Sequence, residues 1–259
     1  MSVKIGIAGV GAIGGAVARA LVRGIEGYEL IALSDTIPKD EFDLPYVSFE
    51  ELAERCDMVI EALPPSVVPS LTAAVFKQGK DLVLISSCAL IMFPEILTQK
   101  RSSKSRIIVP SGALAGFDGV SSLKQLGITS AKIASTKPPK GYTGAPYIIE
   151  KNINLENIDR KQLLFKGNAL EASKFFPANV NVAATLSLAG IGAEKTQVEI
   201  WADPQAKGNS HEIEVVGEYS TIRASVENKP DPANPKSSML AAQSIVSVLR
   251  KISEPLTVL

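Results

Sequence analysis

The sequence has very few of the residues that build metal sites and disulfides. Histidine occurs once, as His211, and cysteine twice, as Cys56 and Cys88, in 259 residues. One imidazole and two distant cysteines do not have the spacing of a metal site, so we expect no metal. Two unpaired thiols are typical of a protein that works in the reducing cytoplasm. If the protein moves protons with an imidazole, His211 must supply it.

Long apolar runs and an excess of one charge are also absent. No stretch reaches the ~20 apolar residues that a membrane-spanning helix needs. The apolar start is interrupted by glycines and has no cleavage pattern, so we expect a strand and a turn there rather than a signal peptide. Lys plus Arg and Asp plus Glu number 27 each. This balance excludes a general attraction to nucleic acid or anionic membranes, and the expected partner is a small molecule.

Apolar segments alternate with segments of helical spacing in the first half of the chain. Examples are "KIGIAGV", "YELIALSD", "DMVIEAL" and "DLVLISS", which are separated by helix-like stretches. One of these, "SFEELAERC", opens with the capping pair Ser48 and Glu51. Continuously apolar strands that alternate with helices indicate a parallel sheet covered on both faces. The predicted fold class is α/β, with a Rossmann-type doubly wound parallel sheet.

The pattern changes after about Ala113. The alternation in "HEIEVVGEYSTIRASVE" is typical of an antiparallel sheet with one solvent-exposed face, and "YIIEKNI" also has the character of a strand. We therefore expect a second α+β domain with a largely antiparallel sheet. The tail "SSMLAAQSIVSVLRKI" predicts a helix that could pack on the first domain. The predicted domains are 1–113 plus 237–259, for dinucleotide binding, and 114–236, for substrate and catalysis.

Gly9, Gly11 and Gly14 have the spacing G-x-G-x-x-G between the first strand and the first helix. In this context the motif favours a dinucleotide site over a purely structural turn. Gly9 would permit the tight turn, Gly11 would let the backbone approach the pyrophosphate, and Gly14 would let the helix pack closely on the strand. The phosphates would lie on backbone amides at the start of the helix, which include those of Ala12 and Ile13.

An acid ends the second predicted strand, as this motif requires. Asp35 follows Gly14 by 21 residues and would accept hydrogen bonds from the adenine ribose. A carboxylate there repels a 2′-phosphate, so NAD is favoured over NADP, although nearby Lys39 could weaken that preference. The turn at 62–66, "ALPPS", is either a loop over the cofactor or an ordinary connection. Cys88 is interpreted as a passive wall, since no second histidine could activate it.

Four later segments together resemble the L-aspartate dehydrogenase family. They are "SGALAGFDG" at 111–119, "FPANVNVAATLSLAG" at 176–190, "HEIEVVGEYSTIRASVEN" at 211–228 and "NPKSSMLAAQSIVSVLR" at 234–250. Their order and the opening glycine motif also agree with this family, so the resemblance covers nearly the whole chain. The sequence departs from the family pattern at Cys88 and Ala115, where glycine is usual.

The resemblance implies a reaction and several site residues. L-Aspartate and NAD, or NADP, would give iminoaspartate and then oxaloacetate and ammonia, and the imine could feed NAD biosynthesis. The resemblance also implies a homodimer, formed through the second domain. His211 corresponds to the family's active-site histidine, and Ala113 and Asn181 correspond to its cofactor contacts.

A substrate with two carboxylates needs cationic donors in a protein without net charge. Lys137 in "STKPPKG" and Lys236 in "NPKSS" are the candidates, with Ser237 beside the second, and the alternative for each lysine is a solvated surface charge. Two other functions are considered. One is a related two-domain reductase for another small dicarboxylic or amino-acid substrate, and the other is a nucleotide-binding protein without turnover.

Overall fold

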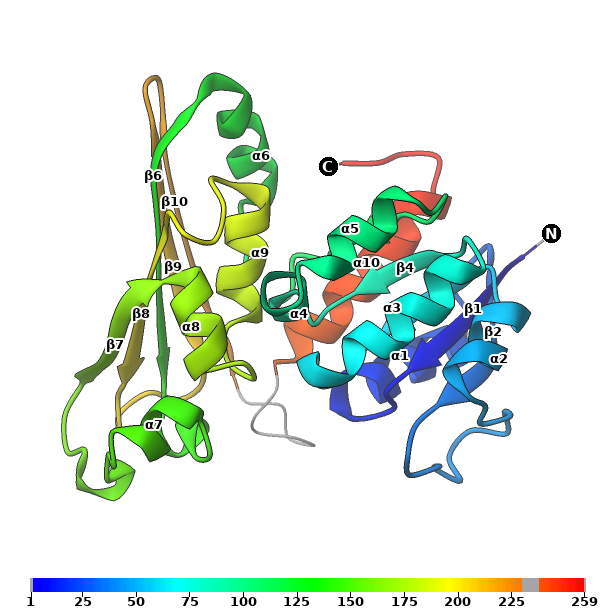
Figure 1. The fold of residues 1–259 in the computed structure, drawn as a ribbon, viewed down its shortest axis with the longest axis horizontal. Coiled ribbons are helices and arrows are strands. Elements are labelled where there is room, and N and C mark those ends of the chain that lie inside the picture. The colour runs from blue at the N-terminus through cyan, green and yellow to red at the C-terminus, as the bar shows by residue number, and fades with distance from the viewer. Residues whose placement is uncertain (1, 230–237, 259) are drawn as a thin grey trace. The chain divides into compact units, whose positions relative to one another are not determined.

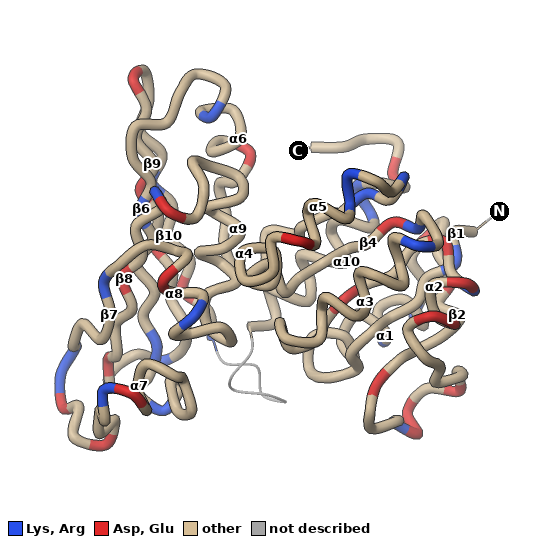
Figure 2. The backbone as a smooth tube through the Cα atoms, viewed as in Figure 1, with Lys and Arg blue, Asp and Glu red and all other residues tan. Residues whose placement is uncertain are grey.

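The chain forms two compact units. In the computed structural model the described residues are 2–229 and 238–258. The first unit combines Met1–Gly112 with Met239–Leu259, and the second unit is Ala113–Ser238 (Figure 1). Figure 2 shows basic and acidic residues at positions intermixed along the backbone of both units, as the balanced composition predicts.

A five-stranded parallel sheet forms the centre of the first unit. Its order is β2-β1-β3-β4-β5, and every neighbouring pair is parallel. A parallel bridge between Leu33 and Tyr46 adds one more position beside β2. With this bridge the order is that of a Rossmann sheet, so the predicted fold class is confirmed. The strands are β1 (Val3–Ala8), β2 (Tyr28–Ser34), β3 (Met58–Glu61), β4 (Asp81–Leu84) and β5 (Ile107–Ile108).

Helices lie against both faces of this sheet. Ile5 and Ile7 share a buried core with α1 and α10, whereas Gly6, between them, faces α2 and has Leu52 against it. The tail helix thus supplies part of the first unit's core, through Ala242, Ile245, Val246 and Leu249. The helices are α1 (Ala12–Arg23), α2 (Phe49–Arg55), α3 (Val68–Lys77), α4 (Cys88–Met92), α5 (Glu95–Arg101) and α10 (Met239–Ser253), with a 3₁₀ turn η1 (Pro65–Val67).

The second unit has a five-stranded sheet of order β10-β9-β6-β8-β7. Only β6 and β8 pair in parallel, so the largely antiparallel sheet that the sequence predicts is confirmed. Helices α6, α8 and α9 contact the strands. The strands are β6 (Ile128–Lys137), β7 (Gln162–Asn168), β8 (Thr196–Ala202), β9 (Ser210–Gly217) and β10 (Thr221–Glu227). The helices are α6 (Phe117–Leu126), α7 (Pro146–Glu150), α8 (Ala169–Phe175) and α9 (Asn181–Ala189), with 3₁₀ turns η2 (Pro139–Tyr142) and η3 (Leu155–Asn157).

The strand predicted at "YIIEKNI" is wrong, because residues 146–150 form helix α7. Pro146 occupies the first helical turn, where its fixed φ favours a helix and its missing N–H is not needed. The ring of Tyr147 then packs against Phe165, Phe175 and Phe176, with centroids 5.3–5.5 Å apart. This aromatic cluster makes a short helix the better way to bury the segment.

Both cysteines are free and buried. Burial raises the pKa of Cys56 to about 11 and that of Cys88 to about 12, so neither is a ready nucleophile near neutral pH. Among residues 2–229 and 238–258, no helix is long and apolar enough to cross a membrane, and no cluster of His, Cys, Asp and Glu could hold a metal ion. The cytoplasmic location stays a prediction.

We predict that Gly14→Ala lowers the free energy of unfolding by about 1–3 kcal/mol, the usual cost of forcing extra atoms into a packed site. An ideal Cβ on Gly14 would lie 1.8 Å from the carbonyl oxygen of Gly9. Urea unfolding followed by circular dichroism measures the change. Gly11→Ala is the matched control, since a Cβ there meets nothing within 4 Å. Equal stability of the two variants would contradict the packing argument.

Candidate active site

The three glycines of the motif have distinct surroundings. Gly9 has φ +88°, and its ideal Cβ would lie 2.3 Å from the carbonyl oxygen of Ala62. An ideal Cβ on Gly14 would lie 1.8 Å from the Gly9 carbonyl oxygen, whereas a Cβ on Gly11 would point into open space. The first and third glycines are therefore needed for packing. The second leaves the backbone open to a ligand, as a pyrophosphate site requires.

The start of helix α1 provides backbone donors beside this open space. Gly11 is the N-cap residue, and Ala12 and Ile13 are the first two helical residues, both half-buried. Amides in the first turn of a helix have no acceptor within it, and the helix dipole adds positive potential there. This arrangement suits an anionic group such as a phosphate.

Asp35 directly follows β2 and is hydrogen-bonded to the glycine turn. Its Oδ2 accepts from the Val10 amide at 2.5 Å and its Oδ1 from the Ile37 amide at 3.1 Å. Partial burial raises the pKa of this carboxyl. The amide hydrogen bonds and the charge of Lys39 outweigh that effect, so the pKa lies below its ordinary value. A carboxylate can accept about four hydrogen bonds, which leaves capacity for ribose hydroxyls.

A cavity of about 670 Å³ opens at the ends of β1, β2 and β3. In a doubly wound sheet this edge, at the point where the strand order reverses, is the usual ligand site. Ala62, Leu63 and Pro64 of the "ALPPS" turn line this cavity, and the place of the turn over a cofactor stays a prediction. The lining residues are Gly9, Gly11, Ser34, Asp35, Thr36, Val47, Ser48, Phe49, Glu50, Ala62, Leu63, Pro64 and Val67.

A cation lies beside the same helix start. The ideal Cβ of Gly15 would be 3.7 Å from the Lys39 Nζ, and the Lys39 amide donates to the Tyr46 hydroxyl at 3.0 Å. Lys39 therefore sits close enough to α1 to act on an anion bound at the glycine turn. This placement bears on the choice between NAD and NADP.

The sequence analysis did not identify Glu61, which is fully buried at the end of β3. Its Oε1 accepts from the Leu63 amide at 2.6 Å and its Oε2 from the Ser86 amide at 2.9 Å. The Ser86 hydroxyl in turn donates to the Leu63 carbonyl at 2.6 Å. Burial raises the pKa of Glu61 to about 7 against the lowering effect of these hydrogen bonds. A carboxylate that ends an otherwise apolar strand was the available signal.

In the second unit, Lys137 ends β6 and is buried, not solvated. Its Nζ donates to the Oδ1 of Asn179 at 2.9 Å and lies 5.9 Å from the centre of the Tyr142 ring. Burial lowers the pKa of Lys137 to about 8, because its partners offer no counter-charge. A desolvated ammonium of this kind is suited to binding a carboxylate or exchanging a proton.

His211 pairs with Ser135 across β9 and β6, with its Nδ1 2.9 Å from the Ser135 Oγ. The histidine is 3% exposed. Burial, and then the charge of Lys137, lower its pKa to about 3. The imidazole is therefore neutral near pH 7, and Nε2 is the nitrogen left to act on a substrate. Sequence reasoning did not identify Ser135, which the alternation of β6 brings to the face that carries His211.

The other predicted site residues lie in three places. Ala113 is the buried first residue of the second unit, and Asn181 is the first residue of α9, whose N-cap is Val180. Their contacts with a cofactor stay predictions. Lys236 and Ser237 lie outside the described residues.

A further polar side chain follows β10. The Asn228 amide donates to the Asn209 carbonyl at 2.8 Å and so extends the pairing of β10 with β9 past Val226 and His211. Alternation along a strand then places Asn228 on the His211 face of the sheet. Within the described part of the chain, the buried Nδ2 of Asn228 has no hydrogen-bond partner.

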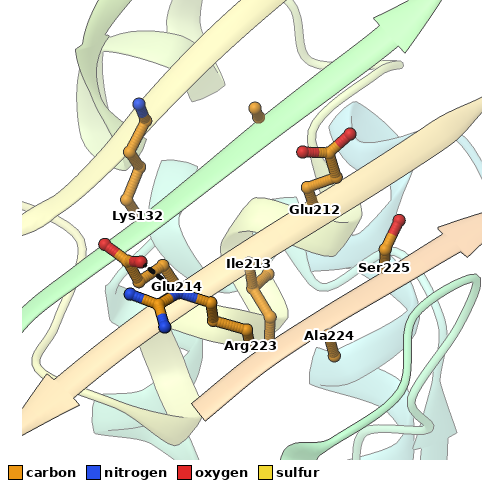
Figure 3. A pocket seen from close by; sticks show the side chains of 8 residues that line it. Lys132, Glu212, Ile213, Glu214, Arg223, Ala224 and Ser225 are labelled. Atoms are coloured by element: carbon orange, nitrogen blue, oxygen red, sulfur yellow. Dashed lines mark hydrogen bonds and ion pairs between the residues drawn. The ribbon is translucent and has the colours of Figure 1, made fainter. Parts of the chain in front are cut away.

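A second hollow, of about 440 Å³, lies on the strand surface formed by β6, β9 and β10 (Figure 3). Glu212 and Glu214 alternate along β9 with His211, so these side chains belong to the opposite face of the sheet. Arg223 donates to Glu214 at 2.6 Å. None of the predicted site residues lines this hollow. Its lining is Lys132, Ala134, Glu212, Ile213, Glu214, Arg223, Ala224 and Ser225.

Several known proteins are similar to this chain in sequence. Residues 118–252 match the family model for the C-terminal part of aspartate dehydrogenase. L-Aspartate dehydrogenase 3 of Bordetella bronchiseptica is 41% identical over 98% of this chain and 96% of its own length. L-Aspartate dehydrogenase of Methanosarcina acetivorans is 42% identical over 98% of both chains.

Solved structures show the same relationship. The crystal structure of aspartate dehydrogenase from Thermotoga maritima has a TM-score of 0.76 and 27% identity, and the match covers all of both chains. A hyperthermophilic archaeal homoserine dehydrogenase, with a TM-score of 0.58 and 12% identity, shares the fold alone. On the evidence of the family model, the full-length relatives and the fold, the chain belongs to the aspartate dehydrogenase family and is an oxidoreductase.

Proposed function

We propose that this protein catalyses the NAD(P)-dependent oxidative deamination of L-aspartate, or the reverse amination. The observation that carries the proposal is that two features occur together in a chain about 40% identical to L-aspartate dehydrogenases. One is an open glycine turn with an acidic partner, and the other is the buried pair Lys137 and His211. The first suits a dinucleotide, and the second suits an anionic substrate that must exchange protons.

The reaction balances without a metal or a covalent enzyme intermediate. L-Aspartate and NAD+ give iminoaspartate, NADH and a proton, and water then converts the imine to oxaloacetate and ammonia. The nicotinamide ring, when bound, accepts the hydride from the substrate Cα. The residues of the chain orient the substrate and manage its protons.

Lys137 is the residue that we assign to a substrate carboxylate. Its ammonium is desolvated and held by Asn179, so a charge-assisted bond to a carboxylate gains strength from the low dielectric. A bound dianion also favours the charged form of Lys137, which raises its pKa. The Nδ2 of Asn228, which has no hydrogen-bond partner among the described residues, is a second donor on the same face.

His211 is the residue that we assign to proton transfer. It is neutral in the free protein, so its Nε2 can accept a proton from the substrate amine or from the attacking water. With Ser135 as acceptor, Nδ1 carries the hydrogen and Nε2 keeps its lone pair. A dicarboxylate beside the ring stabilises the imidazolium that then forms.

The homodimer and the role in NAD biosynthesis stay predictions from the resemblance. The surface that we propose for dimerisation is the Glu212 and Glu214 face of the second sheet. Charges of both signs lie there, including Arg223, Lys132 and Lys166, so a second copy could match them under two-fold symmetry.

We test the reaction by following absorbance at 340 nm with NAD+ and a panel of amino and hydroxy acids. Aspartate should be the preferred substrate. Preference for another amino acid would show that the proposed substrate is wrong and the reaction class right. If none of the compounds is turned over, a nucleotide-binding protein without turnover is the better interpretation.

We predict that Asp35→Ser and Lys39→Ala change cofactor choice in opposite directions. Loss of the carboxylate removes the acceptor for the ribose and the repulsion of a 2′-phosphate, so the ratio of kcat/KM for NADP+ to that for NAD+ should rise about tenfold, a shift of about 1.4 kcal/mol. Lys39→Ala should lower the same ratio. If neither variant changes the ratio, Asp35 does not contact the ribose.

We predict that His211→Asn lowers kcat with aspartate by about 10²- to 10⁴-fold, the usual contribution of an acid–base group. The affinity for NADH, measured by fluorescence titration, should change less than about twofold, because His211 does not line the cofactor cavity. Ser135→Ala keeps the imidazole and should cause a smaller decrease. A near-normal kcat in His211→Asn would indicate that Lys137, and not His211, transfers the proton.

We predict that the inhibition constant of succinate rises as the pH rises through about 8. Succinate has two carboxylates and no amine, so the loss of the Lys137 proton is what its affinity reports. The ammonium is present below a pKa of about 8 and lost above it, which weakens binding by up to about tenfold per pH unit. Lys137→Met should bind succinate weakly at every pH, whereas Lys137→Arg should keep its affinity at pH 9.5. A pH-independent constant in the unchanged protein would exclude this role.

A further inference from the structure

The loops that follow β3 and β4 are linked by their hydrogen bonds to the same buried carboxylate, that of Glu61. We propose that Glu61 is a positioning residue for the cofactor: its ionised carboxylate holds the Ala62–Pro64 wall of the cavity in place, and its protonation loosens cofactor binding. The proposal rests on the proposed binding of the nicotinamide cofactor in the cavity of the first unit.

Three hydrogen bonds form this link between the two loops. The two carboxylate oxygens of Glu61 each accept one backbone amide, from Leu63 at 2.6 Å and from Ser86 at 2.9 Å. The Ser86 hydroxyl closes the ring by donating to the Leu63 carbonyl at 2.6 Å. Amide–carboxylate bonds in a site that excludes water are among the stronger hydrogen bonds of a protein.

The turn Ala62–Pro64 is in direct contact with the glycine motif. Ala62, Leu63 and Pro64 line the cavity, and the carbonyl oxygen of Ala62 occupies the place of a Cβ on Gly9. A displacement of the turn therefore changes the wall of the cavity and the packing of the glycine turn together. Glu61 is fully buried and does not line this cavity, so it acts on the cofactor through Leu63.

Protonation converts Glu61 from an acceptor at both oxygens to a donor at one. A carboxylic hydroxyl oxygen is a poor acceptor, so either the Leu63 or the Ser86 amide loses its partner. Burial raises the pKa of Glu61 to about 7, which places this change near neutral pH. The fold gains stability from the proton below the ordinary pKa and loses that gain as the pH rises through about 7. The ionised form therefore costs stability, and we infer that it is retained for the geometry of the turn.

The elements packed around Glu61 offer it no counter-charge. Its neighbours along the sheet are Ala8 of β1 and Leu84 of β4. The turn Pro65–Val67 and helix Cys88–Met92 contain one titratable group, the Cys88 thiol, whose pKa burial raises to about 12. The groups that set the pKa of Glu61 are its burial and the hydrogen bonds from Ser86, Leu63 and Ile85. Asp35, across the cavity, stays ionised because its pKa is lowered.

The test is NADH binding, followed by fluorescence between pH 6 and 8.5 in the full-length chain. In the unchanged protein the dissociation constant should rise by up to about tenfold per unit as the pH falls below about 7. Glu61→Gln has the same shape but presents an amide donor, so it should bind NADH about tenfold more weakly at pH 8.5, with no pH dependence. The matched control is Glu29→Gln, which removes an exposed carboxylate of β2 that does not line this cavity and should bind NADH as the unchanged protein does.

Hydrogen exchange of the protein without cofactor supplies an independent measurement. At pH 8.5, peptides that cover residues 62–66 and 85–87 should exchange faster in Glu61→Gln than in the unchanged protein, whereas a peptide over 135–142 should not change. Normal exchange together with normal NADH affinity would overturn the proposal. If Glu61→Gln does not fold, Ser86→Ala replaces it. This variant should loosen the same peptides and keep the pH dependence, and loss of that dependence would overturn the proposal.

The outcome for Asp35→Ser separates this proposal from the one on which it rests. If NADH affinity depends on Asp35 but not on Glu61, the cofactor site stands and the positioning role fails. If NADH affinity depends on neither residue, the cofactor does not bind in this cavity and both proposals fail.

Discussion

The close contact between helix α1 and the turn at Gly9 determines the geometry of the whole first unit. The Gly9 carbonyl oxygen occupies the place that a side chain on Gly14 would need, and the Ala62 carbonyl oxygen does the same at Gly9. Helix, turn and the loop after β3 are thus packed backbone against backbone. Because the strands are parallel, Asp35 and Ser86 reach the same edge of the sheet from distant positions in the sequence. A cavity with backbone donors on one side and a carboxylate on the other is the consequence.

Each unit also keeps one ionisable side chain buried with a pKa near neutral. Burial disfavours charge, so it raises the pKa of Glu61 to about 7 and lowers that of Lys137 to about 8. Neither group is balanced by an opposite charge; Glu61 is held by two amides and Lys137 by the Asn179 side chain. In a structural ion pair each charge lies beside an opposite one. A buried ionisable group without an opposite charge is more typical of groups that bind a ligand or position one. The protonation of such groups responds strongly to any charge that enters the site.

Local sequence patterns predicted most elements because their causes are local. The capping pair shows this well, since Ser48 accepts from the Glu51 amide at the start of α2 as the spacing predicts. The glycine motif and the acid after β2 are equally local signals. Helix α7 was predicted wrongly because its apolar residues have the character of a strand, and contacts with Phe165, Phe175 and Phe176 decide its conformation. Those rings come from other parts of the chain, so no local pattern contains them.

Some features of the candidate site also follow from local sequence patterns, and others follow only from the tertiary structure. The sequence by itself determined the doubly wound sheet, the dinucleotide motif with Asp35, and the family resemblance that singled out His211. Only the tertiary structure decided the protonation of the site residues, because a pKa depends on burial and on neighbours that folding brings together. Lys137 could have been a solvated charge, and the structure shows it buried against Asn179. Ser135 and Glu61 carried no signal strong enough to select them. Their importance comes from partners on neighbouring strands and loops, since sheet pairing joins residues that lie far apart in the chain.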